Sequence, residues 1–253
     1  MTRLFLLILL FSAPLTAATL PSSTSLKDFS TQKHKTFQTL IKASLYGEGK
    51  RLFEEITKKN KHDIFWSSKG KKNRYQTAFK RAYPTLKNAD SKGIPDIIFL
   101  IPSFESLWQA KNGTPNSDYG YWQLVPTIVN EIKTLPTTPK KIKSATINKI
   151  RTDPLLSTEA AVIHLRRYYF FFTKVAKFSN SDACFFSIVS YNWGAGNVKR
   201  MLGFMQTEKI PLNFSNFYQV LYNTHKKLPN DKSLRAALEY LPNLWNLAQV
   251  VQK

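Results

Sequence analysis

The chain has 253 residues, with 37 lysines and arginines against 16 aspartates and glutamates, and a formal net charge of +21. Apolar residues make up 43% and there is a single cysteine, which excludes a wholly disordered chain, a disulfide scaffold and a cysteine-rich zinc module. The length fits one large domain, or one domain with an extension, and the charge predicts a polyanionic partner: nucleic acid, an anionic membrane surface or an acidic cell-wall polymer.

Residues 1–18 have the features of a secretory signal peptide. Arg3 precedes an apolar run over residues 4–11, and small residues follow up to Ala17 and Ala18, where we expect cleavage. The run is shorter than the roughly 18–20 residues that span a bilayer, and no cysteine stands there to carry a lipid. We therefore expect an exported protein, periplasmic or associated with the cell wall, soluble after cleavage and with no nucleic-acid partner.

The rest of the chain is predicted to be mostly α-helical. In chain order, the apolar spacing predicts two helices over 35–60, a basic loop over 58–72, a short helix over 75–83, a buried helix over 94–108, a loop or short helical connection over 133–152, and helices over 157–177, 182–192, 214–226 and 233–251. We expect Ser157, and then Asn180 or Ser181, to cap the helices that they precede, and Gly194 to end the helix before it. Alternating strand patterns are scarce.

One carboxylate stands out in the buried helix over 94–108. Helical spacing places Glu105 on the same face as Ile97, Ile101 and Trp108, and Pro102 is expected to kink the helix. Residues 93–132 are also mildly acidic, with a net charge of −3 inside a strongly basic chain. Burial raises the pKa of a carboxyl group, which suits a general acid, but a structural glutamate satisfied by an arginine or a helix end fits the pattern too.

Three motifs in order distinguish these alternatives. Glu105-Ser106 is followed by Gly120-Tyr121-Trp122-Gln123, with the glycine fifteen residues after the glutamate, and then by Tyr191-Asn192-Trp193-Gly194-Ala195-Gly196. This set resembles the lysozyme-like lytic transglycosylases that cleave peptidoglycan, closest to the membrane-bound lytic murein transglycosylase D group. Residues 151–161 and 234–248, the latter with Tyr240-Leu241-Pro242, are similar to further helices of that family.

The resemblance covers about residues 90–250 and implies the fold and domains. We expect a signal peptide over 1–18, a basic helical N-terminal extension over 19–90, and a lysozyme-like catalytic domain over 91–253. The family implies a reaction without cofactor or metal. Glu105 would protonate the glycosidic oxygen between N-acetylmuramic acid and N-acetylglucosamine, and would then take the proton of the muramoyl 6-hydroxyl as a 1,6-anhydro ring closes.

The resemblance also assigns roles to residues around Glu105. Ser106 would orient Glu105 or a substrate group, although a hydroxyl bonded to the helix backbone is an equal alternative. Tyr191 would hydrogen-bond the carboxyl of Glu105. The remaining substrate-binding candidates are Thr114, Gln123 and Asn192. Trp122, Trp193 and Tyr119 are candidates for stacking on sugars, with at least one tryptophan expected in the core.

Asp118 departs from the family pattern and keeps two other functions open. We favour a surface residue there, but a carboxylate near the cleft would activate water and make the protein a hydrolytic lysozyme-type muramidase. A non-catalytic peptidoglycan-binding assembly factor is the third hypothesis. The expected partners are peptidoglycan glycan strands, with electrostatic association to an anionic wall or membrane surface, and we expect a monomer. Cys184 is predicted to be a buried free thiol.

Overall fold

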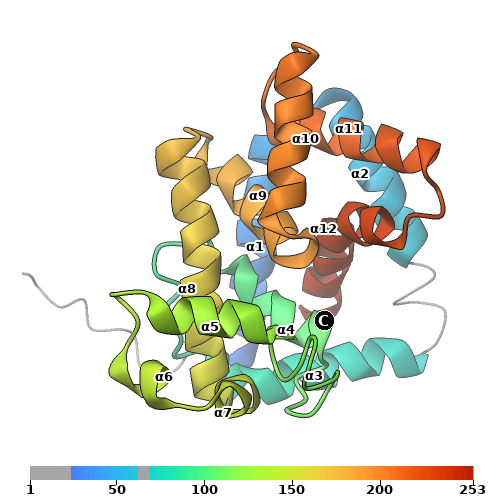
Figure 1. Cartoon of the computed structure of the whole chain (residues 1–253). Coiled ribbons are helices and arrows are strands. Elements are labelled where there is room, and N and C mark those ends of the chain that lie inside the picture. Colours follow the sequence, from blue (N-terminus) through green and yellow to red (C-terminus); the bar gives the residue numbers. More distant parts are fainter. Residues whose placement is uncertain (1–23, 62–68, 253) are drawn as a thin grey trace, which may run out of the picture.

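The computed structural model describes residues 24–61 and 69–252, and these residues are mostly helical (Figure 1). Within them the structure has no strand, only two isolated bridges that join Gly113 to Tyr119 and Tyr119 to Leu124. The prediction of a mostly α fold is confirmed. The expected signal peptide and most of the expected basic loop over 58–72 lie outside the described residues. None of the helices in the described part of the chain is long and apolar enough to cross a membrane.

The helices follow the predicted order with longer or shifted bounds. The first group is α1 (Leu26–Ser44), α2 (Gly47–Asn60), α3 (Lys69–Leu86), the 3-10 helix η2 (Asp96–Leu100) and α4 (Ile101–Glu105). The second group is α5 (Pro126–Thr134), α6 (Lys140–Ser144), α7 (Ile147–Thr152), α8 (Pro154–Phe170) and the π-helix η3 (Phe171–Val175). The last group is α9 (Asn180–Trp193), α10 (Ala195–Thr207), α11 (Phe214–Lys227) and α12 (Lys232–Val251).

Two of the predicted N-caps are wrong, and both errors have a local cause. The cap of α8 is Asp153, whose carboxylate accepts hydrogen bonds from two backbone N–H groups of the first turn, while Ser157 is buried within the helix. Pro154 directly after that cap favours an earlier start, because its fixed φ suits the first helical position. The cap of α9 is Ser179. Gly194 ends α9 with a φ of +86°, as predicted.

The predicted helix over 94–108 is shorter and less regular than expected. It divides into η2 and α4, with Pro102 in the first turn of α4, and it ends at Glu105. Leu107 and Trp108 then have φ values of +52° and +55°. Trp108 is still buried, since this tight turn carries its ring to within 4.5 Å of the Tyr121 ring, measured between centroids. The turn therefore places the end of α4 against the loop that carries Gln123.

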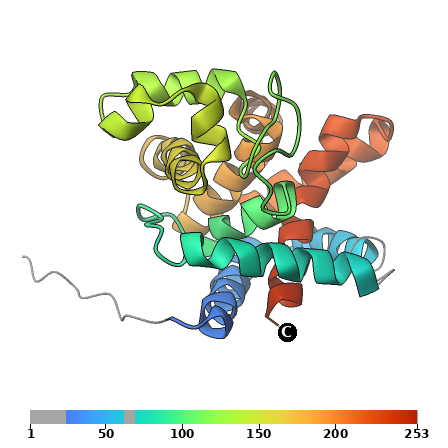
Figure 2. The same ribbon diagram turned by 90° about the horizontal axis from the view of Figure 1, so that it is seen from below.

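Helix α12 organises the core, because it packs against α1, α2, α3, α4, α9, α11 and η2 (Figure 1). Helix α3 lies across one end of the molecule, where it contacts α4, α8 and α12 (Figure 2). The first two helices share this core: Phe37 of α1 packs against Phe185 and Trp245, and Phe53 of α2 packs against Tyr218. The helices predicted as an N-terminal extension therefore support the same core as the C-terminal helices.

A buried ion pair joins α1 to the segment beneath α4. The Nζ of Lys33, which is 2% exposed, lies 2.5 Å from Oδ2 of Asp96 in η2. Burial lowers the pKa of Lys33, and the adjacent Asp96 carboxylate opposes that shift. Separating α1 from η2 would leave a buried charge without its partner, which is costly. The pair therefore ties α1 to η2, the segment directly before α4.

Candidate active site

Glu105 is the last residue of α4, and the residue is only partly exposed. The Tyr240 hydroxyl of α12 donates a hydrogen bond of 2.5 Å to its Oε1. Burial raises the pKa of Glu105, the bond from Tyr240 opposes that shift, and the charge of Asp118 adds to it. A carboxyl group in this setting keeps its proton at a higher pH than an ordinary glutamate and remains within reach of solvent.

Tyr240 is the partner of Glu105 that the sequence did not single out. The ring is 2% exposed, and it packs edge-on against Phe104, the residue before Glu105 in α4. Burial and the nearby Glu105 raise the pKa of Tyr240 well above its ordinary value, so its hydroxyl stays protonated and available as a donor. The only signal in the sequence was its place in a segment similar to the family's C-terminal helix.

Tyr191 does not bond to Glu105, which corrects the role expected for it. Its hydroxyl instead donates a hydrogen bond of 2.5 Å to the backbone carbonyl of Trp122. Trp122 is fully buried and donates its Nε1–H to Oγ1 of Thr158 in α8, so the expectation of one tryptophan in the core is confirmed. Tyr191 therefore fixes the backbone one residue before Gln123.

Ser106 also acts on this loop. Its hydroxyl is 1% exposed and lies 2.7 Å from the carbonyl of Tyr121 and 3.0 Å from that of Pro102. The hydroxyl accepts a further bond from the backbone N–H of Gln109. These bonds match the alternative of a backbone-bonded hydroxyl, which the sequence left equal to a role in orienting Glu105 or a substrate group. Ser106 joins the end of α4 to the loop over 112–124.

Arg151 holds the same loop from its inner side. The residue is 3% exposed, and its guanidinium donates to three backbone carbonyls, those of Pro115 at 2.7 Å, Ser117 at 3.0 Å and Leu124 at 3.3 Å. The carbonyl of Arg151 accepts from the N–H of Tyr121. A Cβ at Gly120 would lie 2.0 Å from that carbonyl oxygen, so only glycine, here with a φ of +83°, fits the position.

Gln123 stands at the end of this loop with a φ of +50°. Its Nε2 donates to the carbonyls of Gly120 at 2.7 Å and Asn112 at 3.0 Å. No donor from the described residues reaches its Oε1, although that oxygen lies 2.9 Å from where a Cβ on Gly113 would be. The amide nitrogen is thus used to shape the loop, and the carbonyl oxygen is left as an acceptor.

The other candidates lie on exposed parts of the same region. Thr114 and Asp118 are exposed on the loop, where the N–H of Thr114 bonds to the carbonyl of Asp118. Asn192 is exposed at the end of α9, and Trp193 is half-buried with its Nε1–H bonded to Ser233. The exposure of Asp118 agrees with the surface placement that we favoured, although its charge still acts on Glu105.

Possible metal ligands do not gather in the described part of the chain, where no group of three or more His, Cys, Asp or Glu side chains occurs. His164 is 4% exposed, and burial lowers its pKa to about 4. Its ring packs against Tyr168 and Tyr191. Cys184 is fully buried and free, as predicted.

Comparison with protein families identifies the region around Glu105. The family model described as "Transglycosylase SLT domain" matches residues 85–214, just over half of the chain, from the end of α3 to the first residue of α11. No curated protein matches the chain. The match includes Glu105, Gln123, Arg151 and Tyr191, and it stops before Tyr240.

Proposed function

The chain belongs to the transglycosylase SLT family, lytic transglycosylases of the lysozyme-like superfamily that act on peptidoglycan, and we propose that Glu105 is its single catalytic acid and base. The proposed reaction cleaves the β-1,4 bond from N-acetylmuramic acid to N-acetylglucosamine without water and leaves a 1,6-anhydro end. The observation that carries the proposal is the partly buried Glu105 carboxyl with the neutral Tyr240 hydroxyl bonded to its Oε1.

The first step uses the proton that burial retains on Glu105. Glu105 donates it to the glycosidic oxygen, the bond to the muramoyl C1 breaks, and the acetamido oxygen of the same sugar bonds to C1. The carboxylate left behind is stabilised by the hydrogen bond from Tyr240, because that bond favours the ionised form. Tyr240 therefore matters most after the proton has left.

The second step returns the proton to Glu105. The carboxylate takes a new proton from the muramoyl 6-hydroxyl. The oxygen of that hydroxyl attacks C1 and displaces the acetamido oxygen as the 1,6-anhydro ring closes. Glu105 is then protonated again and no water has been consumed. This one-carboxylate route is the substrate-assisted exception among glycosidases.

The remaining residues divide into substrate contacts and positioning residues. We assign Oε1 of Gln123 to a sugar N–H or hydroxyl, and exposed Asn192 and Thr114 to further contacts along the strand. Tyr191 and Ser106 hold the loop that carries Gln123 and need not touch the sugar. The likeness to the D group, the export of the protein and a monomeric state complete the proposal.

The product distinguishes this function from its alternatives. Purified protein is incubated with peptidoglycan sacculi, and the soluble fragments are analysed by mass spectrometry. The proposal expects 1,6-anhydromuropeptides, each one water lighter than the reducing product. Reducing ends would instead support a hydrolytic muramidase with exposed Asp118 as second carboxylate, and Asp118→Ala would test it. Intact sacculi would support the non-catalytic assembly factor.

The basic surface is a separate part of the proposal. We assign it to attraction of the anionic wall or membrane surface, since residues 19–92 carry 17 basic and 6 acidic residues. Salt screens exposed charges. The inactive Glu105→Gln protein should therefore bind to sacculi less tightly at high salt than at low salt. Binding that salt does not change would contradict this role.

A further inference from the structure

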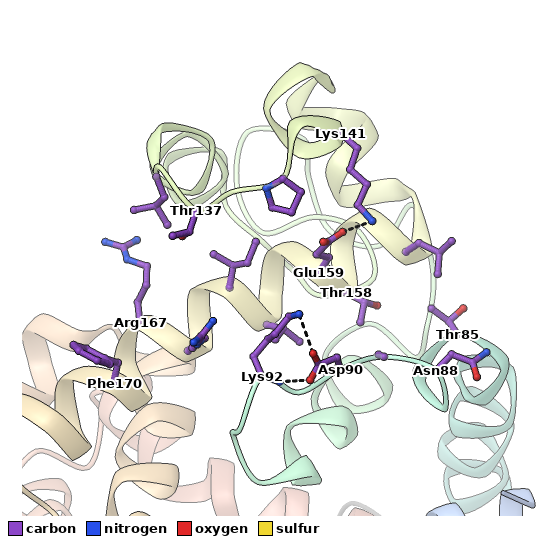
Figure 3. Close-up of a pocket in the computed structure, with 17 residues that line it drawn as sticks. Thr85, Asn88, Asp90, Lys92, Thr137, Lys141, Thr158, Glu159, Arg167 and Phe170 are labelled. Carbon is purple, nitrogen blue, oxygen red and sulfur yellow. Dashed lines mark hydrogen bonds and ion pairs between the residues drawn. The ribbon is translucent and has the colours of Figure 1, made fainter. Parts of the chain in front are cut away.

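A hollow lies on the outer face of α8, and Glu105 does not line it. It has a volume of about 850 Å³ and is lined by α8, by residues 85–92 from the last turn of α3 into the loop after it, and by residues 135–141 from the end of α5 into the first turn of α6 (Figure 3). We call it the α8 cavity. None of Glu105, Gln123, Tyr191 and Tyr240 lines it.

The α8 wall of the cavity alternates apolar side chains with polar and charged ones. Val162 and Ile163 lie at its centre, and Leu155 and Phe170 stand near the two ends of α8. Leu155 is 65% exposed and Phe170 is 59% exposed. Val162 is buried and belongs to the core, where α8 packs against α9, so the exposed apolar side chains of this wall are Leu155 and Phe170.

Of the cationic side chains that line the α8 cavity, one has no carboxylate partner among the described residues. Lys141 is paired with Glu159 at 2.6 Å, and Lys92 with Asp90 at 2.8 Å, so each carboxylate already has a cation (Figure 3). Arg166 is exposed and makes no hydrogen bond or ion pair with any described residue.

Arg166 nevertheless contributes to the field inside the cavity. Hydrogen bonds from Lys92 lower the pKa of Asp90, and the charge of Arg166 adds to that shift. Arg167, the next residue, turns its guanidinium toward Glu131, at 3.0 Å. Arg166 is thus the guanidinium that can take a carboxylate from a ligand, with two parallel hydrogen bonds.

We propose that the α8 cavity binds the stem peptide of peptidoglycan, with Arg166 paired to a peptide carboxylate and the apolar side chains of the α8 wall against the methyl and methylene groups. The inference rests on the proposed function for its choice of polymer. Stem peptides combine several carboxylates with small apolar side chains, which matches the charge and the wall of the cavity. The volume lies in the range of sites that take ligands of a few residues, whereas a folded partner needs a larger surface.

One residue of the cavity wall contacts the loop that carries Gln123. Thr158 lines the cavity and also accepts the hydrogen bond from Nε1 of Trp122, at 3.0 Å. One buried side chain therefore separates the cavity from the loop over 112–124. A peptide bound there would hold the polymer beside the cleft without entering it, so peptide-bearing strands would be favoured over bare glycan.

Binding is tested with a defined probe and the full mature chain. The probe is N-acetylated L-alanyl-γ-D-glutamyl-meso-diaminopimelyl-D-alanine, titrated by NMR into Glu105→Gln protein. We expect shifts at residues of α8 and of the segment over 85–92. In Arg166→Gln/Glu105→Gln protein the affinity should fall about tenfold, the loss of one charge-assisted pair. The matched control is Arg200→Gln, a change at an exposed arginine of α10 outside the cavity. A probe whose carboxylates are amidated should bind the Glu105→Gln protein as weakly as the unmodified probe binds the Arg166 variant.

Digestion separates this inference from the proposed function. The preference of the enzyme for peptide-bearing strands over amidase-treated, peptide-free strands should fall in Arg166→Gln and stay high in Arg200→Gln, while the products remain 1,6-anhydro fragments. Equal affinity of wild type and Arg166→Gln for the probe, or shifts confined to Gln123 and its neighbours, would overturn the inference and leave the lytic reaction intact. If the protein forms a dimer and Arg166→Gln prevents it, the inference is also overturned, because the cavity would then be occupied by a second copy of this chain.

Discussion

The Glu105 site and the α8 cavity show what burial does to the same chemical group. Burial raises the pKa of Glu105 and outweighs the hydrogen bond from Tyr240. Asp90, at the rim of the α8 cavity, is exposed, and hydrogen bonds from Lys92 lower its pKa. One carboxyl group thereby keeps its proton to a higher pH than an ordinary glutamate, and the other is held as an anion paired with its lysine.

Two arginines repeat the contrast. Arg151 is buried and donates to three carbonyls of the loop over 112–124, so its charge is used entirely inside the protein. Arg166 is exposed and has no such partner among the described residues. A buried arginine shapes a loop, whereas an exposed one beside a hollow is available to a ligand. The difference is the basis on which we propose chemistry at the Glu105 site and recognition at the α8 cavity.

The largest effect is expected at Glu105. Glu105→Gln removes the only proton donor of the proposed reaction, so kcat/KM should fall by about 10²–10⁴-fold. Release of soluble fragments from labelled sacculi measures it. Glu208→Gln, a change at an exposed carboxylate of the surface, is the matched control and should retain wild-type rates. Comparable activity in Glu105→Gln would remove Glu105 from the mechanism.

The same variant tests the raised pKa through stability. Because folding raises the pKa of Glu105, the folded state binds this proton more tightly than the unfolded state does. The resulting stability is complete below the unfolded pKa and is lost as the pH rises through the folded pKa. Glu105→Gln should therefore gain stability relative to wild type as the pH increases, which urea denaturation at several pH values measures. A difference that does not vary with pH would contradict the buried setting.

Arg151 is expected to have the second largest effect. Arg151→Met keeps an apolar stem but leaves three carbonyls of the loop without their donor, at a cost of about 3 kcal/mol in unfolding free energy. Amide hydrogen exchange should become faster over 112–124, and KM should rise because Gln123 is no longer held. Arg81→Met, at an exposed position of α3, is the control. Unchanged exchange in that loop would show that Arg151 does not position it.

A smaller effect is expected at Tyr240, where the pH profile is the sensitive measurement. Tyr240→Phe removes the hydrogen bond that lowers the pKa of Glu105, so that pKa should rise further. The reaction needs protonated Glu105, and the alkaline limb of kcat/KM should therefore move to higher pH. The kcat should fall about tenfold, because the carboxylate loses a donor. Tyr218→Phe, which removes a buried bond to the carbonyl of Leu238, is the control and should leave the limb in place.

The smallest effect is expected at the rim of the α8 cavity. Lys141 and Glu159 form an ion pair in which the lysine side chain is 62% exposed. Such pairs contribute little, so Lys141→Met should change the unfolding free energy by less than about 1 kcal/mol. Urea denaturation at low and high salt measures it. A loss as large as that expected for Arg151→Met would mean that the cavity is part of the structural core and would remove the contrast between the two regions.

The sequence by itself determined the helical class and the order of most helices, and it singled out Glu105 as the residue on which the proposed reaction depends. Apolar spacing is a local property that survives without knowledge of the fold, and the spacing of the three motifs identifies the same family as the match over 85–214. The helix over 195–207 escaped prediction, and the N-caps of α8 and α9 were misplaced by a few residues, because several neighbouring side chains could serve as caps.

The tertiary structure alone decided which side chains meet. Tyr240 reaches Glu105 across 135 positions of sequence, and the bond expected from Tyr191 goes to a backbone carbonyl instead. The hydrogen bonds from Arg151 to three loop carbonyls, and the hollow outside α8, likewise depend on how distant segments pack. No periodicity encodes these contacts, since hydrogen bonds between distant segments form only when α12, α8 and the loop over 112–124 share one core.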